Sequence, residues 1–428
     1  MISDLPAQLG ARLTVTDDAA WPLRTSRYIA DAAGAGGLIG CGAGRDQQAA
    51  AIRAVMELVE RTAQFAPTSV PVAAVDSYVR LGAEALCPEQ LGLYSEGQYR
   101  AAGSPVTPFV PHQSLEWVQV TEVRTGRRRL VPVEFVYPRA AVTRGRLVVE
   151  TSSGTAAGTT YEQALCGAIS EVVERDSAML FWHRHVPTHS IASQRLEPAI
   201  ADELETVRLL GYDVLACDLT YDLGIPVVLL IALRERSFAW GLGCDLDPRR
   251  AAAHALRELG ARLRWLAVAD SSETLHLPRG MVLTGEDHYR LYSRGPLHDT
   301  LRGFLTAVVR HPQPDEASTA DGHAAGDPAI GTHSGSSASG PHNSDPPPPD
   351  RSAAARLVGL LADAGYETYA HSLQAPSWDG DDLHVVRVIV PGLVPFWVGA
   401  DKQRLGCHRL VGSTSPGRLT NLLPHMFG

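Results

Sequence analysis

The motif Glu-x-x-Glu-Arg contains the residues best suited to chemistry, and it occurs twice. Its residues are Glu57, Glu60 and Arg61 in the first copy and Glu171, Glu174 and Arg175 in the second. Residues three apart lie on one face of a helix, so two such helices facing each other would gather four carboxylates. These would repel one another and raise each other's pKa unless cations lay among them. Because oxygen-rich clusters suit Mg²⁺, which usually accompanies phosphates, the motif predicts a nucleotide and magnesium site.

The two motifs end two similar segments, 41–65 and 154–181. Each opens with glycine and small residues and continues as an alanine-rich stretch with apolar residues at helical spacing. The spacing from Gly44 to Glu57 equals that from Gly158 to Glu171. A glycine-rich entry followed by a helix start would offer backbone N–H groups to an anion. We therefore expect one structural unit to occur twice.

A third segment, 241–266, has the same order of glycines and alanine-rich helix and carries a single acid, Glu258, at the matching place. Asp247 is expected to cap this helix, with Pro248 in its first turn.

A solvated helix face is the alternative interpretation, in which Glu57 and Arg61 form an ordinary i,i+4 ion pair. However, apolar pairs stand between the glutamates in both copies, namely Leu58-Val59 and Val172-Val173. A helix that is apolar between its acids is at least partly buried, and buried acids need partners.

Another repeat indicates the scaffold. Residues 204–220 read as a helix, Gly-Tyr and a strand, followed by a buried strand at 225–234, and 355–373 with 383–392 repeat this order. Such units predict an α+β fold in which helices pack on mixed sheets. A further strand, 130–138, is expected at the edge of a separate sheet.

Composition excludes several classes of protein. The 428 residues carry a net charge of −9, which argues against general nucleic-acid binding. No apolar run is long enough to span a membrane, and we expect no signal peptide. The six cysteines are scattered without a zinc-site spacing, so reduced thiols and a cytoplasmic location are expected.

These segments resemble the YcaO family, in particular its azoline-forming, SagD-like branch. The stretch 152–182 resembles the central family signature, a glycine loop leading to Glu-x-x-Glu-Arg-Asp. MELVER around Glu57, LGCDLDPRRAAAHALREL at 242–259, LTGEDHYRLYS at 283–293 and the ending LTNLLPHMFG resemble further family motifs. The resemblance covers nearly the whole chain from about residue 32, apart from one insertion.

The resemblance implies a YcaO-like α+β fold that binds ATP and Mg²⁺ in a cleft lined by the three glutamate helices. In the azoline-forming branch, a Cys, Ser or Thr side chain of a ribosomally made peptide attacks the preceding backbone carbonyl. ATP then phosphorylates the resulting oxygen, and phosphate leaves as a thiazoline or oxazoline ring forms. Catalysis would consist mainly of positioning and charge neutralisation. No catalytic base can be named.

Carried over by position, the resemblance assigns two groups of site residues. The expected metal ligands are Glu57, Glu60, Glu171, Glu174 and Glu258. The expected nucleotide contacts are Arg175, which would face the phosphates, with Thr159, Gln163, His254 and Arg45.

Several of these positions depart from the family pattern. Ala43 stands where the family usually has lysine, Thr159 where it often has asparagine, and His254 where it usually has arginine. The tail contains Pro424 alone where the branch tends to have three prolines.

The expected organisation has four parts. They are an N-terminal segment at 1–31, a first part of the YcaO core at 32–310, a disordered Gly/Pro/Ser-rich insertion at 311–352 and the rest of the core with the tail at 353–428. The insertion has almost no large apolar residues, so burial cannot offset the entropy of ordering it.

The expected partners are a precursor peptide, a separate leader-binding protein related to ubiquitin-activating enzymes (E1-like, ThiF-like) and a second copy of the chain. Three functional hypotheses stay open. The first is an azoline-forming cyclodehydratase, and the second is a YcaO enzyme that makes a thioamide or an amidine. The third is a degenerate, non-catalytic YcaO that binds peptide or scaffolds a complex.

Overall fold

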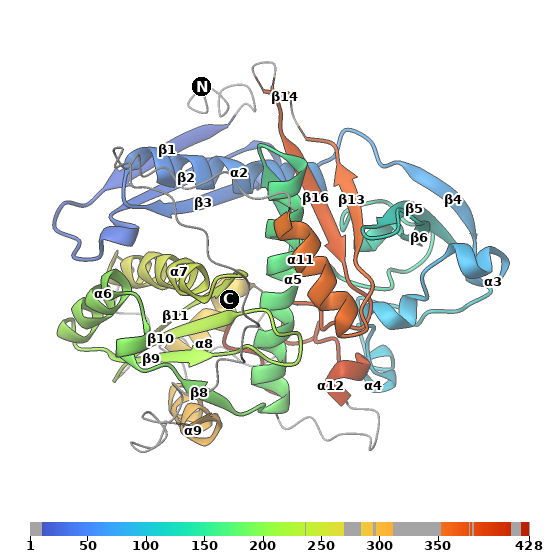
Figure 1. Cartoon of the computed structure of the whole chain (residues 1–428). Coiled ribbons are helices and arrows are strands. Elements are labelled where there is room, and N and C mark those ends of the chain that lie inside the picture. The colour runs from blue at the N-terminus through green and yellow to red at the C-terminus, as the bar shows by residue number, and fades with distance from the viewer. Residues whose placement is uncertain are drawn as a thin grey trace, which may run out of the picture.

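The structure is a computed structural model that describes residues 11–235, 237–268, 284–293, 297–310, 352–375, 377–378, 381–411 and 421–427. It confirms the predicted α+β class, with three main sheets arranged around a long helix (Figure 1). The predicted insertion at 311–352 lies outside the described residues except for Ser352. In the described part of the chain, no helix is long and apolar enough to cross a membrane.

The first sheet has three antiparallel strands in the order β1-β2-β3 and supports helix α2 (Figure 1). Its elements are β1 (Arg12–Asp17), β2 (Tyr28–Ala33), β3 (Ile39–Gly44) and α2 (Gln47–Phe65). Asp46 caps α2 by accepting a hydrogen bond from the N–H of Ala49 at 2.7 Å. Ala50, Ala54 and Leu58 form the buried face of the helix toward this sheet.

The second sheet has the order β11-β10-β9-β8-β12 and carries helices α6 and α7. Its elements are β8 (Thr188–Ser190), α6 (Pro198–Leu209), β9 (Asp213–Asp218), β10 (Val227–Arg234), β11 (Ser237–Cys244), α7 (Pro248–Val268) and β12 (Val309–Arg310). The predicted helix, Gly-Tyr and two strands are confirmed here as α6, β9 and β10. Helix α7 begins at Pro248, and Asp247 accepts from the N–H of Arg249, as predicted.

The third sheet has the order β4-β5-β13-β16-β7, with β6 paired to β5. Its elements are β4 (Val72–Ser77), β5 (Ser114–Glu122), β6 (Arg128–Pro132), β7 (Thr155–Gly158), β13 (Tyr369–Leu373) and β16 (His384–Ile389). The strand predicted at 130–138 is therefore shorter, because residues 133–135 turn into a 3-10 helix. It also belongs to the sheet that contains β7 and not to a separate one.

Helix α5 (Tyr161–Arg184) runs through the middle of the molecule, in contact with β7, β16 and β11 (Figure 1). It is buried along much of its length because sheets and helices surround it. The remaining elements are α3 (Tyr78–Leu81), α4 (Glu96–Tyr99), α8 (Gly285–Ser293), α9 (His298–Val308), α11 (Ser352–Asp363), β14 (Ser377–Trp378), β15 (Asp381–Asp382) and α12 (His408–Val411).

The three main sheets share one feature of topology that positions the site. Each ends on one side with a glycine-rich strand, β3, β7 or β11, and that strand leads directly into α2, α5 or α7. These three edge strands and their helices bring together the segments that carry the glutamates.

Candidate functional site

Three strand–helix units build the site, and the first and third match residue for residue. Gly40 and Gly42 of β3 lie against the backbone of α2, and Gly241 and Gly243 of β11 lie in the same way against α7. A Cβ atom at any of these glycines would collide with a helix carbonyl, so only glycine allows the strand to approach this closely. The predicted glycine-rich entries are thus edge strands packed on their helices.

The first glutamate of each helix is held by the edge strand of its own unit or, in the second unit, by the residue just before that strand. Glu57 accepts from the N–H of Cys41 at 2.6 Å, Glu171 from that of Gly154 at 3.0 Å, and Glu258 from that of Leu242 at 3.4 Å. An edge strand has backbone N–H groups without a neighbouring strand, and these carboxylates satisfy one in each unit. The N–H groups predicted to bind an anion are therefore already partly used.

The side chain of Glu60 extends from α2 and accepts a hydrogen bond from the N–H of Ala157 in β7 at 2.8 Å. It therefore connects the first and second units. The matching residue of α5 is Glu174, whereas α7 has Ala261 at this place. This difference explains why the cluster contains five glutamates. The five are Glu57, Glu60, Glu171, Glu174 and Glu258.

The charges of the five glutamates act on one another. Burial raises the pKa of Glu57, and the charges of Glu171 and Glu258 raise it further. Burial also raises the pKa of Glu60 well above its usual value, with added repulsion from Glu171 and Glu57. The pKa of Glu174 is raised to about 8 by burial and then by Glu258 and Glu171. A bound cation would stabilise the charged form of these carboxylates.

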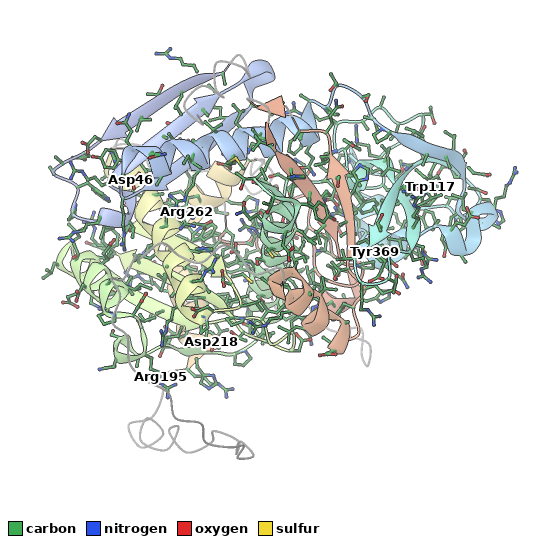
Figure 2. The ribbon with its side chains drawn as sticks, turned by 45° about the horizontal axis from the view of Figure 1, so that its top comes forward. Asp46, Trp117, Arg195, Asp218, Arg262 and Tyr369 are labelled. Carbon is green, nitrogen blue, oxygen red and sulfur yellow. The ribbon has the colours of Figure 1, made fainter. Side chains whose placement is uncertain are left out.

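Glu258 differs from the others. Burial opposes its charge, but the attraction of Arg262 and Arg175 outweighs burial and lowers its pKa. Arg262 pairs with Glu258 at 3.0 Å and lies on the side of α7 that faces α2 (Figure 2). Its guanidinium stacks on the ring of Trp240 at 3.5 Å.

A pocket of about 670 Å³ opens between α2 and α7 beside the glutamates. Glu57 and Glu258 line it together with Arg53, Arg257 and Arg264. The pKa of Arg257 is lowered to about 10 by burial and then by the charge of Arg53. Among the described residues, Arg257 has no hydrogen bond or ion pair. Two mutually repelling cations next to an acidic cluster suit an anion that carries a metal ion, such as a polyphosphate.

Of the five predicted nucleotide contacts, Arg175 and His254 lie near the glutamates, and the other three lie away from the pocket. Arg175 lies in the glutamate cluster, with ion pairs to Glu171 at 3.5 Å and to Glu174 at 3.6 Å. His254 lies one turn before Glu258, and its pKa is lowered to about 4 by burial and by Arg257. It therefore adds no charge to the site at neutral pH.

Thr159, Gln163 and Arg45 lie away from the pocket lining. The hydroxyl of Thr159 donates to Gln163 at 2.6 Å, so these two side chains satisfy each other beside the start of α5. Arg45 is largely exposed and reaches Glu203 of α6 at 3.8 Å. Sequence reasoning missed Arg53, although it stands four residues before Glu57, just as His254 stands four before Glu258.

The glutamates and arginines of the site are of the right chemical type to bind ATP with Mg²⁺, but the carboxylates lie apart from one another in this structure. Within the described residues, no three His, Cys, Asp or Glu side chains are grouped closely enough to hold a metal ion. The glutamates are held apart by backbone N–H groups and arginines, so metal binding would require them to exchange these partners. The carboxylates supply the oxygen ligands that Mg²⁺ prefers, and the arginines supply donors for phosphate.

Comparison with known families gives a match over residues 41–394 to the family described as YcaO cyclodehydratase, ATP- and Mg²⁺-binding. Two relatives share part of the sequence. An uncharacterized protein in the tfuA 3′ region of Rhizobium leguminosarum bv. trifolii is 28% identical over 249 residues, which is 54% of this chain and 56% of that protein. An uncharacterized protein of Methanothermobacter thermautotrophicus is 30% identical over 153 residues, which is 34% of this chain and 40% of that protein.

Solved structures share the fold. A heterocyclase in complex with substrate and cofactor superposes with a TM-score of 0.66 at 22% identity, over 90% of this chain and 50% of the heterocyclase. YcaO from Methanopyrus kandleri bound with AMPPCP and Mg²⁺ gives 0.58 at 21% identity, over 92% and 91%. The Escherichia coli microcin synthetase McbBCD complex gives 0.65 at 11% identity, over 97% and 96%. This chain thus spans about half the length of the heterocyclase and of the Rhizobium relative.

Proposed function

This chain belongs to the YcaO family of ATP- and Mg²⁺-binding cyclodehydratases, and from that premise we propose that it forms thiazoline or oxazoline rings in a ribosomally made peptide. The family's cofactors agree with those implied by the sequence resemblance. The observation that carries the proposal is a group of five interacting glutamates, two of which, Glu57 and Glu258, line one pocket with Arg257, a cation that has no partner among the described residues. The likeness to heterocyclases supports an azoline outcome.

In this proposal, Glu57, Glu60, Glu171, Glu174 and Glu258 hold the metal ions. The metal ions, when bound, neutralise the charge of the phosphates and connect them to the protein. Arg53, Arg175 and Arg257 orient the phosphates from the two sides of the site. Arg53 supplies a cation on α2, so the absence of a lysine at Ala43 and of an arginine at His254 does not leave the phosphates without donors.

The partners are proposed on the same basis. We propose that the chain acts in the cytoplasm as a homodimer, on a precursor peptide delivered by a separate E1-like protein. The McbBCD complex, whose fold this chain shares, is an assembly of several proteins and supports the need for partners. The 670 Å³ pocket is large enough for a nucleotide, so we place the peptide outside it.

Calorimetry of ATP·Mg²⁺ binding tests the site. Wild-type protein should bind, and Glu171→Gln should lose metal-dependent binding. Arg257→Met should weaken binding by about 10- to 100-fold, because one hydrogen bond to a charged group contributes about 1.5–3 kcal/mol. Arg80→Met is the matched control, since Arg80 is 79% exposed on α3 and forms a surface ion pair with Asp76.

Mass spectrometry of a precursor peptide then tests the reaction. A loss of water that depends on ATP, on the peptide's Cys, Ser or Thr and on Glu171 would support azoline formation. If the wild-type chain binds no ATP·Mg²⁺, even with an E1-like partner and a peptide present, the enzyme proposal fails and a scaffold role remains.

A further inference from the structure

The arginine of each motif has a second partner in the first and third units, namely a carbonyl of the edge strand. Arg61 donates to the carbonyl of Ile39 and also pairs with Glu57 at 2.6 Å. In α7, Arg262 donates to the carbonyl of Trp240 at 3.3 Å. In these two units the arginine and the first glutamate together satisfy a carbonyl and an N–H group of the same strand. Each arginine is thereby tied to its own edge strand.

The second unit breaks this pattern. By its spacing from the arginine, the carbonyl that corresponds to those of Ile39 and Trp240 is that of Ser153, which lies in the turn just before β7, and Arg387 of β16 donates to it. Arg175 is left with its two long ion pairs to glutamates and with the ring of Phe396 at 4.9 Å. Its Nε atom is buried and has no hydrogen-bond partner among the described residues.

Strand register explains why an outside arginine reaches this carbonyl only here. Arg387 pairs with Thr155 of β7 across the sheet. The residues that pair with the corresponding positions in the first and third units are Asp31 and Leu229, neither of which has a side chain that can donate to a carbonyl at neutral pH. The second unit alone therefore has a guanidinium at this position of the strand next to its edge strand.

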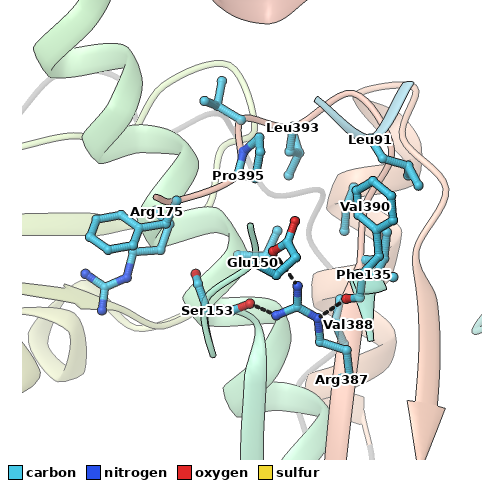
Figure 3. A pocket seen from close by; sticks show the side chains of 14 residues that line it. Leu91, Phe135, Glu150, Ser153, Arg175, Arg387, Val388, Val390, Leu393 and Pro395 are labelled. Atoms are coloured by element: carbon cyan, nitrogen blue, oxygen red, sulfur yellow. Dashed lines mark hydrogen bonds and ion pairs between the residues drawn. The ribbon is translucent and has the colours of Figure 1, made fainter. Parts of the chain in front are cut away.

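Arg387 is fixed in this place by buried contacts on every side. Its Nη2 atom donates to Glu150 at 3.1 Å and its Nε atom to the carbonyl of Phe135 at 3.1 Å. Arg404 binds the other oxygen of Glu150. Figure 3 shows the guanidinium of Arg387 between Ser153, Glu150 and the strand, while Arg175 points away from them. A second guanidinium cannot share the carbonyl without like-charge repulsion.

We infer that Arg387 is a positioning residue that occupies the Ser153 carbonyl and thereby leaves Arg175 available to the phosphates of the nucleotide. This inference rests on the proposed ATP site for the role of Arg175. The displacement of Arg175 from the strand is a separate, structural statement. In the absence of Arg387, Arg175 should turn back to Ser153, as Arg61 does to Ile39.

The test variant is Arg387→Leu, and the wild type is its control. Leucine is the residue found at the corresponding position of the third unit, Leu229. Arg404 keeps its ion pair with Glu150 in this variant, so no buried charge is left without a partner. Thermal unfolding of both proteins establishes that they fold.

Crystal structures without nucleotide give the first readout. We expect the Arg175 guanidinium within hydrogen-bond distance of the Ser153 carbonyl in Arg387→Leu and beside Glu171 and Glu174 in the control. If Arg175 stays beside the glutamates in both, the inference is overturned. This readout is independent of nucleotide binding, so it decides the inference even if the wild type binds no ATP.

Calorimetry with ATP·Mg²⁺ gives the second readout. Arg387→Leu should bind at least about tenfold more weakly than the wild type, which is the size expected for one lost charge-assisted contact. Adding Arg175→Met to Arg387→Leu should weaken binding no further, because Arg175 has already left the site. A further loss equal to that of Arg175→Met in the control background would mean that Arg387 acts independently of Arg175, against the inference.

Discussion

Replacing Glu174 by glutamine should stabilise the metal-free protein at alkaline pH, although Glu174 is a proposed metal ligand. Its side chain is 11% exposed, and burial with the charges of Glu258 and Glu171 raises its pKa to about 8. Glutamine resembles the protonated acid in shape but does not ionise. The variant therefore removes the free-energy cost of the buried charge and retains the packing.

The raised pKa of Glu174 determines how the stability of the protein changes with pH. Between about pH 4.5 and about pH 8, the unfolded chain releases this proton while the folded protein retains it, so stability falls as pH rises. A shift from 4.5 to about 8 corresponds to about 4 kcal/mol at pH 8. Because side-chain movement and water entry reduce such costs, we expect Glu174→Gln to stabilise by about 1–3 kcal/mol there. The gain should vanish near pH 4.5.

Urea unfolding in EDTA from about pH 4.5 to about pH 8 measures this effect. Glu89→Gln is the control, because Glu89 is exposed and the loss of its charge should change little. With ATP and Mg²⁺ added, the wild type should gain stability and the variant should gain much less. If Glu174→Gln is neutral or destabilising at pH 8 in EDTA, Glu174 does not carry the unfavourable buried charge argued above.

Two further predictions concern the scaffold. Gly241→Ala should destabilise the protein by several kcal/mol or prevent folding, because the new methyl group would strike the carbonyl of Ala255. Gly303→Ala, at an exposed position in α9 with open space around it, should instead raise the midpoint of thermal unfolding by the equivalent of about 0.5–1 kcal/mol. The pKa of His183 is lowered to about 4 by burial, so only the unfolded state binds this proton as the pH falls below about 6.5. His183 should therefore contribute a fall in stability of up to about 1.4 kcal/mol per pH unit toward pH 4, and His183→Gln should remove that contribution in urea unfolding; equal slopes in the two proteins would contradict this reasoning.

Much of the fold could be predicted because its signals are local. Helical spacing of apolar residues predicted α2, α5 and α7, and Asp247-Pro248 predicted where α7 begins. The Gly-Tyr repeats predicted two helix–strand–strand units, both of which are present. The strand expected at 130–138 was wrong in its end and in its sheet, because pairing partners are set by segments far away in the chain.

The candidate site could be predicted only in part. The repeated motif pointed to four glutamates and the third segment to Glu258, because residue spacing on a helix is fixed by the helix itself. The glycines were interpreted as anion-binding loops, whereas the structure uses them for close contact between strand and helix. Arg45 lies near Ala43, the position where the family usually has lysine, yet its side chain turns to Glu203.

The sequence by itself thus determined the three helices, their acids and the family to which they belong. Tertiary structure decided how the charged groups are placed. Arg53 and Arg257 line the same pocket, and Arg387 donates to the carbonyl of Ser153. These relations join residues that are tens to hundreds of positions apart in the chain. Spacing along one helix cannot encode them, since they depend on how three sheets place their edge strands around α5.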